Sequence, residues 1–362
     1  MCRRKGKNRI AIVAGGTGGH VFPALCVAEH LILEGNDVIF VTDLRGNRYL
    51  ESFRGGKKIV QNIDTSTRIR LYGSLFLYTI RSIISMLLSR VDCVVGFGGY
   101  PSIPFVLAAQ ILRIKTIIHE QNATLGKANR VLSVVARKVL TSFPDTKNLN
   151  KASDKKNITT GNPTRFDKEI CKTSSREKKY SDVFTILIIG GSQGARIFSG
   201  SVADTICDIS EKYKLRVIAQ CRPDDVKILE EKYEAAGIEH KISPFFEDIG
   251  ELYDEADLVI SRAGASSIFE IIHFQKPAIL IPFPYSINGD QMANAQFLGD
   301  RGAAIVIEED YIDRQNLAKH LEHIINDPAV RGKMSQKLGL LRTPEPTKKI
   351  AEIIIAPLPN SS

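Results

Sequence analysis

Short apolar runs rich in β-branched residues recur along the chain and alternate with segments whose apolar residues repeat at helical spacing. A short continuous apolar run that ends in glycine or polar residues is typical of a strand buried in a parallel sheet. Regular alternation of such strands with helices predicts an α/β fold. The predicted strands are residues 10–14, 37–42, 92–96 and 116–119 in the first half and 184–189, 216–220, 258–261, 278–282 and 304–307 in the second.

Two of the predicted strands end in similar glycine-rich loops. Residues 10–14 lead into Gly15-Gly-Thr-Gly-Gly-His20, and residues 184–189 lead into Gly190-Gly-Ser-Gln-Gly-Ala195. A helix-like segment follows each loop. The same unit at equivalent places in each half predicts two Rossmann-like, doubly wound domains in tandem.

The boundary between these domains is expected in a polar region. Residues 147–156 and 168–181 are basic and poor in apolar residues, and Gly161-Asn-Pro163 is a turn signal. We therefore expect an N-terminal domain of residues 1–163 and a C-terminal domain of residues 164–344. Residues 345–358 include a short helix-like segment that could join the N-terminal domain or pack on the other one.

Composition narrows the class of protein. The 362 residues are 43% hydrophobic and 25% charged, as in an ordinary globular chain. The six cysteines are scattered without C-x-x-C spacing, which argues against a disulfide framework, a thioredoxin-type site and a structural zinc and favours a reducing cytosol. The apolar run before Gly15 is too short for a signal peptide. No transmembrane helix is predicted, because the longest apolar stretch contains Gly73, several serines and Arg81.

The net charge of +9 permits contact with anions such as nucleotides or an acidic lipid surface. Basic residues occur in the polar linkers and around one apolar helix, without a recognised nucleic-acid-binding module. No nucleic-acid partner is therefore expected.

Glycine-rich loops after strands bind phosphate, since the backbone can approach closely and the next helix offers its first N–H groups. Neither loop is a P-loop, because no Gly-Lys-Ser/Thr follows. The dinucleotide fingerprint fails at Val21, which occupies the third glycine position, although Asp43 lies near the place of a ribose-binding acid. A dehydrogenase and glycines that merely allow tight turns remain alternatives.

His20 ends the first loop at the expected start of a helix. The positive end of the helix dipole disfavours imidazolium, so the neutral ring could accept a proton; a capping or packing role is the alternative. The histidines show no metal-ligand spacing, and no Asp-x-Asp pair occurs. The sequence thus predicts no metal site, and a leaving group would be stabilised by helix N-termini, hydroxyls or cations.

A second candidate site follows the strand at residues 258–261. Glu270 could accept hydrogen bonds from a pair of ribose hydroxyls, but Ser267 and Glu270 also have the spacing of a capping box. Further along, Asn288, Asp290, Gln291 and Asn294 form a polar cluster that suits either a polyol or a solvated loop.

Residues 71–89 separate into two faces at helical spacing. The apolar face contains Phe76, Ile80, Ile83 and Leu87, and the other face contains serines and Arg81. A core helix and a membrane-surface helix both remain possible.

Taken together, several strings resemble the MurG family, the undecaprenyl-diphospho-muramoylpentapeptide β-N-acetylglucosaminyltransferases of peptidoglycan synthesis. The resemblance covers about residues 10–300 in the family's order. The strings are Gly15 to Pro23, Gly98-Gly-Tyr100, His119-Glu-Gln-Asn122, Gly161-Asn-Pro-Thr-Arg165, Gly190 to Ala195 and Ser261 to Glu270.

The resemblance implies a GT-B fold, with two Rossmann-like domains that face a cleft. It implies transfer of GlcNAc from UDP-GlcNAc to the C4 hydroxyl of the muramoyl sugar of lipid I, with inversion, without a metal and without a cofactor. Basic residues around residues 71–90 could hold such an enzyme peripherally at the anionic cytoplasmic face of the inner membrane, where the polyprenyl acceptor is met. The candidate membrane and acceptor patch comprises Phe76, Ile80, Ile83, Leu87 and Arg81.

The resemblance also assigns residues by position. His20 is the candidate base. Thr17, Gly18 and Gly19 would line the cleft beside the sugar and diphosphates. Asn122 and Gln291 would contact GlcNAc, and Glu270 would bind the ribose. The remaining residues expected around the donor nucleotide are Arg165, Ser192, Phe246, Ala265, Ser266, Ser267, Ile268 and Phe269.

Three alternatives stay open from the sequence. The chain could be a glycolipid glycosyltransferase or a UDP-GlcNAc 2-epimerase on the same fold. It could also be a non-catalytic nucleotide-binding scaffold of the cell-wall machinery.

Overall fold

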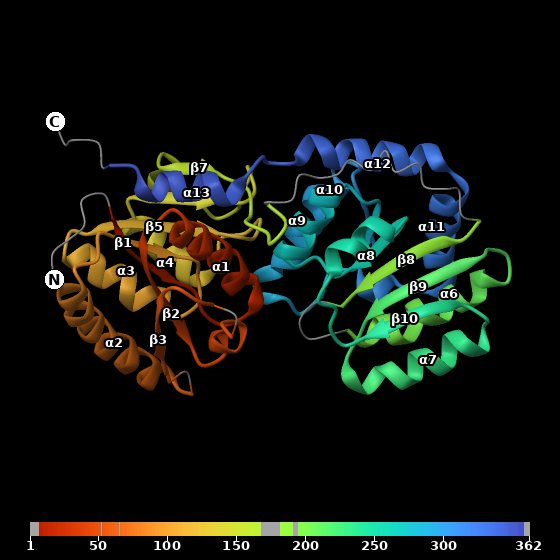
Figure 1. The fold of residues 1–362 in the computed structure, drawn as a ribbon. Coiled ribbons are helices and arrows are strands. Elements are labelled where there is room, and N and C mark those ends of the chain that lie inside the picture. Colours follow the sequence, from red (N-terminus) through yellow and green to blue (C-terminus); the bar gives the residue numbers. More distant parts are fainter. Residues whose placement is uncertain (1–6, 52, 65, 168–181, 191–194, 358–362) are drawn as a thin grey trace. The chain divides into compact units, whose positions relative to one another are not determined.

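The computed structural model describes residues 7–51, 53–64, 66–167, 182–190 and 195–357. The chain divides into two compact units (Figure 1). Unit 1 comprises Met1–Lys168 together with Thr343–Ser362, and unit 2 comprises Glu169–Arg342. The C-terminal segment therefore returns to unit 1. The polar segment 168–181 and part of the second glycine loop, including Ser192, lie outside the described residues.

Unit 1 contains a seven-stranded, fully parallel sheet with the order β3-β2-β1-β4-β5-β6-β7. Its central strands are continuous apolar runs because helices cover both faces of the sheet. The strands are β1 (Arg9–Val13), β2 (Asp37–Asp43), β3 (Lys57–Gln61), β4 (Cys93–Gly96), β5 (Lys115–Glu120), β6 (Lys138–Thr141) and β7 (Asn157–Thr159).

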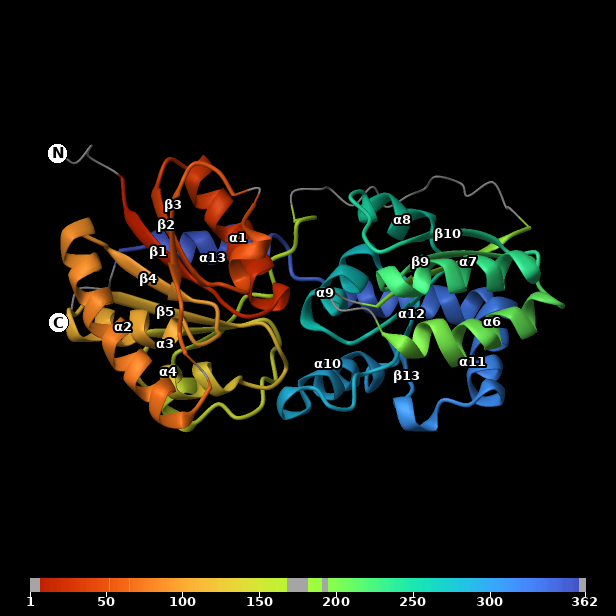
Figure 2. The same ribbon diagram turned by 90° about the horizontal axis from the view of Figure 1, so that it is seen from below.

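Helices cover each face of this sheet in a separate group (Figures 1 and 2). On one face, α1 (Gly18–Leu33) and α13 (Pro346–Ile355) pack on the sheet beside the short η1 (Gly46–Tyr49). The opposite face carries α2 (Arg68–Ser89), α3 (Ser102–Ile111) and α4 (Lys127–Val135), with the short α5 (Lys151–Asp154) next to α4. The apolar side of α13 is buried through Ile350, Ala351 and Ile354.

Unit 2 contains a six-stranded parallel sheet with the order β10-β9-β8-β11-β12-β13. The strands are β8 (Phe184–Ile189), β9 (Leu215–Gln220), β10 (Glu239–Ser243), β11 (Leu258–Ser261), β12 (Ala278–Leu280) and β13 (Ile305–Val306).

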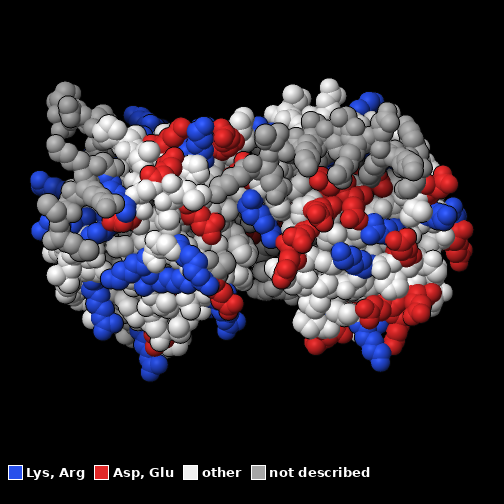
Figure 3. Space-filling model, in the orientation of Figure 1, with Lys and Arg blue, Asp and Glu red and all other residues white. Residues whose placement is uncertain are grey.

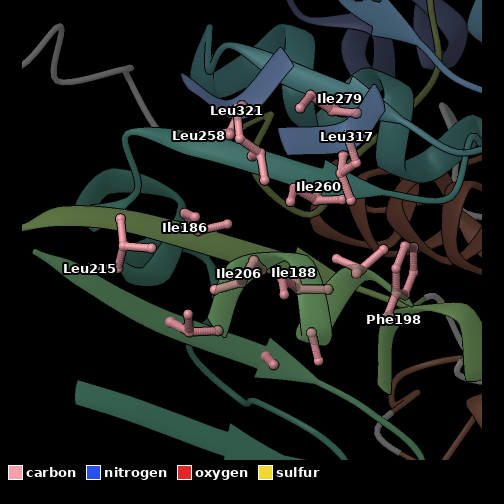
Figure 4. Packing of buried hydrophobic residues seen from close by; sticks show 14 of the residues in the cluster. Ile186, Ile188, Phe198, Ile206, Leu215, Leu258, Ile260, Ile279, Leu317 and Leu321 are labelled. Atoms are coloured by element: carbon pink, nitrogen blue, oxygen red, sulfur yellow. The ribbon is translucent and has the colours of Figure 1, made fainter. Parts of the chain in front are cut away.

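The helices of unit 2 also form two layers. In Figure 4, Ile188 of β8 and Ile260 of β11 pack with Ile206 and Leu317 in one apolar core. This face is covered by η2 (Phe198–Val202), α6 (Ala203–Ser210), α7 (Val226–Ala235) and α11 (Arg314–Asn326), and the short η3 (Pro223–Asp225) directly precedes α7. The other helical elements are α8 (Ile249–Glu255), α9 (Ala265–Phe274), η4 (Ile287–Gly289), α10 (Asp290–Gly299), η5 (Glu309–Tyr311) and α12 (Pro328–Leu341).

Two sequence-based expectations need correction. Residues 147–156 are not a linker, because they contain α5 and lead directly into β7, the edge strand of the sheet in unit 1. The helix expected at residues 71–89 is α2, which begins earlier, at Arg68, where the side chain of Thr67 accepts a hydrogen bond from the Arg70 N–H.

The orientation of α2 differs from that of a core helix. Its buried side chains are Ser82 and Met86, whereas Phe76 is 71% and Leu87 is 61% exposed. Ile83 is half-buried and packs against the core. Of the two alternatives, the core helix is thus wrong for α2, since most of its apolar face points to solvent.

Among the described residues, α2 is also the one helix that is long and apolar enough to cross a membrane by length and composition. The sequence-based expectation of no such helix is therefore not met on these two criteria. Only 11% of the apolar stretch of α2 that meets these criteria is buried within the protein.

Charge is distributed unequally between the units (Figure 3). Unit 1 has 28 Lys and Arg against 13 Asp and Glu, a net +15, whereas unit 2 has 21 against 27, a net −6. The positive surplus of the whole chain therefore comes from unit 1.

Candidate functional site

The order of strands in unit 1 reverses between β1 and β4, so the connections leaving these two strands diverge. In an open parallel sheet, ligands bind beyond the carboxyl ends of the strands at this switch point. Residues 14–17 follow β1, and residues 97–101 follow β4. Both predicted motifs, Gly15 to His20 and Gly98-Gly-Tyr100, therefore lie at the same edge of the sheet.

These two loops approach each other so closely that only glycine fits. A Cβ on Gly99 would lie 2.6 Å from the Gly15 carbonyl oxygen, and the φ of Gly99 is +79°. A Cβ on Gly15 would lie 2.7 Å from the ring of Pro101. The glycines therefore have a packing role as well as a conformational one.

Asp43, at the end of β2, holds the first loop in place. Its Oδ1 accepts hydrogen bonds from the N–H groups of Gly16 at 3.0 Å and Gly46 at 2.7 Å. The side chain is therefore engaged by the backbone of its own domain, which differs from the ribose-binding role of a dehydrogenase acid.

Helix α1 begins within the glycine loop, with Thr17 as its N-cap and Gly18 and Gly19 in its first turn. Thr17 is exposed and its hydroxyl makes no capping hydrogen bond. The first N–H groups of a helix have no intrahelical acceptor. The start of α1 thus offers backbone donors and one hydroxyl to an anion.

His20 is oriented by the same loop. Its Nδ1 lies 3.0 Å from the Gly15 carbonyl oxygen. A carbonyl can only accept, so Nδ1 carries the hydrogen and the neutral ring keeps the Nε2 lone pair as a proton acceptor. A Cβ on residue 98 would lie 3.1 Å from Nε2, so Gly98 leaves space beside that atom.

Asn122 is positioned by the carboxylate of Glu120, which is 1% exposed. Glu120 Oε1 accepts from the Asn122 N–H at 3.1 Å and from its side-chain amide at 3.4 Å. Oε2 accepts from the Gly126 N–H at 2.8 Å and from Asn129 Nδ2 at 2.9 Å. Four donors on one carboxylate fix the loop between β5 and α4.

His119, the first residue of this motif, is fully buried. Its Nε2 lies 3.2 Å from the Gly161 carbonyl oxygen, and Gln121 Nε2 lies 3.0 Å from its Nδ1. Burial lowers the pKa of His119 to about 4, so the ring is neutral at physiological pH. His119 therefore joins the two motifs within unit 1 as an uncharged hydrogen-bonding group.

In unit 2, the strand order reverses between β8 and β11. The second glycine loop follows β8, and Arg262, Ala263 and Gly264 follow β11. Ser192 lies outside the described residues, so its expected contact with phosphates stays a prediction.

The segment after β11 forms the start of α9. Gly264 is the N-cap, and Ala265, Ser266 and Ser267 occupy the first turn. Ser267 is therefore not an N-cap, and the capping-box interpretation of Ser267 and Glu270 is wrong. The side chains of Ile268 and Phe269 are buried, and the Ile268 N–H donates to the Gly264 carbonyl oxygen at 3.0 Å, so these two residues support the helix start from within.

Glu270 lies one turn further along α9 and is partly exposed. The hydroxyl of Tyr253, from α8, donates a hydrogen bond to Glu270 Oε2 at 3.2 Å. A carboxylate held in this way can accept hydrogen bonds from a vicinal diol.

Gln291 lies in the first turn of α10. Its Oε1 accepts from the Phe283 N–H at 3.0 Å, which directs the amide nitrogen as a donor. Asn294, on the same helix, donates from Nδ2 to the Ala263 carbonyl oxygen at 3.0 Å. The predicted polar cluster is thus ordered by the loops that precede α9 and α10.

The other predicted residues lie in different surroundings. Arg165 is exposed in unit 1, with its guanidinium 5.3 Å from the centre of the Phe166 ring. Phe246 is buried in unit 2, with Lys241 Nζ 5.6 Å from its ring centre. Within the described ranges, no cluster of three or more His, Cys, Asp or Glu side chains is arranged to hold a metal ion.

Some residues that organise these sites were not singled out by sequence. Glu120 carries a sequence signal only as part of a motif, and Tyr253 and Asn129 carry none. Each acts through a neighbour brought close by the fold, and an isolated tyrosine or asparagine in a helical pattern carries no local signal for that.

The two doubly wound parallel-sheet units have the architecture of the GT-B fold. The glycosyltransferase family 28 N-terminal domain matches residues 10–141, and the family 28 C-terminal domain matches residues 185–352.

Individual relatives narrow this class. The chain is 34% identical over 371 residues to the UDP-N-acetylglucosamine–N-acetylmuramyl-(pentapeptide) pyrophosphoryl-undecaprenol N-acetylglucosamine transferase of Paramagnetospirillum magneticum, with 98% of each chain covered. It is 37% identical over 339 residues to the same enzyme of Rickettsia felis, covering 91% of this chain and 94% of that one. The crystal structure of Acinetobacter baumannii MurG superposes with a TM-score of 0.81 at 30% identity, covering 96% and 99%. The chain belongs to the MurG family of N-acetylglucosaminyltransferases.

Proposed function

We propose that this chain transfers GlcNAc from UDP-GlcNAc to the C4 hydroxyl of the muramoyl sugar in undecaprenyl-diphospho-MurNAc-pentapeptide. The products are UDP and the lipid-linked disaccharide, and the anomeric configuration inverts. The activity in the printed names of its relatives supports this reaction. The structural observation that carries the proposal is the orientation of His20 by the Gly15 carbonyl.

His20 acts as the general base. Nε2 takes the proton of the acceptor hydroxyl as its oxygen attacks the anomeric carbon opposite the leaving diphosphate. Nδ1–H continues to donate its hydrogen bond to the Gly15 carbonyl oxygen, which fixes the ring during the transfer. Thr17 and the N–H groups of Gly18 and Gly19 stabilise nearby negative charge.

The donor nucleotide is bound by unit 2. Glu270 accepts hydrogen bonds from the ribose, the start of α9 and Ser192 bind the phosphates, and Gln291 donates to GlcNAc. Phe246 of the same unit borders the nucleotide, and the roles of Arg165 beside the nucleotide and of Asn122 on GlcNAc, both residues of unit 1, stay predictions. No metal is required, because helix N-termini and hydroxyls meet the charge that develops on UDP.

The enzyme binds peripherally to the anionic cytoplasmic face of the inner membrane through unit 1. The exposed face of α2 offers apolar side chains that include Phe76, Ile80 and Leu87, and Arg81 on the same helix is exposed as well. The net +15 of unit 1 favours an anionic lipid surface. The polyprenyl acceptor is thereby met without the chain crossing the bilayer.

The other face of α2 supports a surface location rather than a membrane span. Ser82 and Met86 are buried against unit 1, and Tyr78 accepts a hydrogen bond from the Asn62 N–H at 2.9 Å. Insertion of α2 across a bilayer would break these contacts and would place Arg81 within the hydrocarbon.

The test is transfer by the purified protein with UDP-GlcNAc and a short-chain lipid I analogue, with and without EDTA. We expect formation of UDP and the disaccharide product in both cases. Loss of activity in EDTA would contradict the metal-independent mechanism. UDP-ManNAc production without acceptor would instead identify an epimerase, and donor binding without turnover on any lipid acceptor would identify a scaffold.

A further inference from the structure

We propose that Tyr253 is a positioning residue that sets the orientation of the Glu270 carboxylate and thereby the preference of the enzyme for a ribonucleotide donor. The proposal rests on the proposed donor site, in which Glu270 binds the ribose. Tyr253 itself does not touch the donor, because its side chain is fully buried.

Tyr253 contacts two residues of α9 that are one helical turn apart. Its ring stacks on Phe274, with the ring centres 4.7 Å apart and the planes at 4°. Its hydroxyl donates to Glu270 Oε2 at 3.2 Å. Residues four apart lie on the same side of a helix, so the stacked ring delivers the hydroxyl to the carboxylate.

The hydrogen bond from Tyr253 restrains the terminal carboxylate, which is the most mobile part of a glutamate side chain. The terminal torsion of a glutamate side chain has a broad energy profile, so the plane of an unsupported carboxylate rotates easily. A hydrogen bond to one oxygen fixes that plane. Two ribose hydroxyls need two correctly directed acceptor positions, so a fixed plane favours the diol over a sugar with one hydroxyl.

Burial makes the hydroxyl of Tyr253 a specific donor rather than a solvated one. A tyrosine hydroxyl removed from water requires a partner, and the phenol selects the charged oxygen of Glu270. The two helices, α8 and α9, are thereby joined at the point where Glu270 leaves the helix surface.

The chain provides a matched control in Tyr233. This residue is also fully buried in unit 2, on α7, and its hydroxyl has no hydrogen-bond partner among the described residues. Tyr233→Phe and Tyr253→Phe therefore remove the same atom from equally buried rings, and only the second removes a contact with Glu270.

The experiment measures the dissociation constants of UDP and 2′-deoxy-UDP by calorimetry for the wild type, Tyr253→Phe, Tyr233→Phe and Glu270→Gln. We expect Tyr253→Phe to weaken UDP roughly three- to tenfold while changing 2′-deoxy-UDP much less, since a hydrogen bond to a charged group is removed only from the diol contact. Tyr233→Phe should leave both constants unchanged. In the transfer reaction, Tyr253→Phe should raise KM for UDP-GlcNAc with little change in kcat.

The outcomes separate this proposal from the proposed function. Equal weakening of both nucleotides by Tyr253→Phe, or no weakening, would overturn the positioning role while leaving the donor site intact. If Glu270→Gln still prefers UDP over 2′-deoxy-UDP, Glu270 does not bind the ribose, and the positioning role of Tyr253 is overturned. Absence of UDP binding by the wild type would overturn the donor site and this proposal together.

A second variant covers the case in which Tyr253→Phe is poorly folded. Glu270→Asp shortens the side chain by one methylene and withdraws the carboxylate from the tyrosine hydroxyl while leaving the buried ring in place. We expect the preference for UDP to shrink in this variant as well, and an unchanged preference would contradict the proposal.

Discussion

Thr347 donates both its backbone N–H and its hydroxyl to Oδ2 of Asp167, a residue 180 positions earlier in the chain. Thr347 lies in the first turn of α13, whose own N-cap, Glu345, makes no side-chain capping bond. Asp167 thus supplies the cap from the other segment of unit 1. The negative charge also lies at the helix end that favours it. The chain leaves unit 1 after Lys168 and returns to it at Thr343. The contact between Asp167 and Thr347 therefore ties together the two segments of unit 1 near these points.

Asp167→Ala should loosen the start of α13. Loss of a cap typically destabilises a helix by ~1 kcal/mol, so we expect amide hydrogens in the first turns of α13 to exchange roughly 5- to 10-fold faster. Hydrogen exchange with mass spectrometry measures this. Asp154→Ala, at an exposed position of the same unit, is the control and should leave exchange in α13 unchanged. Unaltered exchange in Asp167→Ala would rule out the capping role.

The same carboxylate gives a pH dependence. Burial raises the pKa of Asp167, although the hydroxyls of Thr347 and Thr164 oppose the shift. Because its folded-state pKa is above the unfolded value, the stabilisation is fully present below the unfolded pKa and is lost as the pH rises through the folded pKa. Asp167→Asn does not titrate at this position. As the pH rises from the unfolded pKa to the folded pKa of Asp167, the amide hydrogens of α13 in the wild type should therefore lose protection from exchange relative to those in Asp167→Asn. A constant difference would contradict the assignment.

Glu120 offers a prediction on the Asn122 loop. Glu120→Gln replaces one acceptor oxygen with an amide group, which would face two of the four donors that the carboxylate now accepts. We expect the free energy of unfolding to fall by about 1–3 kcal/mol and kcat/KM for transfer to fall at least tenfold. Urea denaturation and the transfer assay measure the two effects.

Asn122→Ser separates the two roles. This change removes the side-chain amide and leaves the Asn122 N–H and the other donors on Glu120 in place. We expect lower activity with a much smaller loss of stability than in Glu120→Gln. Full activity in Glu120→Gln would show that this network does not position Asn122 for the reaction.

Much of this architecture follows from local sequence signals. The central strands β1, β4, β8 and β11 are continuous apolar runs, and their buried positions explain why the pattern predicts them. The strands that the pattern missed include β3 and β10, which lie at sheet edges. Their side chains are largely exposed, so their sequences contain lysine, glutamate and histidine and have no apolar run.

The candidate sites could be predicted from sequence only where the backbone requires particular residue types, such as glycine. Glycine spacing identifies the loop before His20, because Gly15 and Gly99 leave no room for a Cβ. In contrast, the contacts of Glu270 with Tyr253 depend on the packing of α8 on α9. The outward apolar face of α2 opposes the usual burial of apolar residues, so periodicity alone could not decide its direction.

His20 carries the central prediction on the chemistry. His20→Ala should lower kcat by about 10²-fold or more, the usual range for loss of a general base. His20→Asn is the more informative variant, since its amide can still donate to the Gly15 carbonyl oxygen but cannot accept a proton as Nε2 does.

We expect His20→Asn to bind UDP-GlcNAc normally and to be as slow as His20→Ala. Calorimetry with UDP-GlcNAc and initial rates on the lipid I analogue measure the two properties. Near-normal turnover in either variant would remove His20 from the role of base.

The exposed face of α2 provides the prediction on membrane binding. Phe76→Glu and Leu87→Glu place a charge on side chains that are now largely exposed, so the fold should persist. Insertion of one such side chain into lipid contributes about 1.5–3 kcal/mol. Each variant should therefore bind anionic vesicles at least tenfold more weakly in a sedimentation assay.

Leu340→Glu is the matched control, because Leu340 is 82% exposed but lies on α12 of unit 2. It should bind vesicles as the wild type does. We also expect high salt to release the wild type from vesicles, since the electrostatic attraction of unit 1 is screened over about 10 Å at 0.1 M and less at higher salt. Equal weakening by Leu340→Glu would disprove a specific role of α2, and release by detergent but not by salt would show that α2 spans the bilayer.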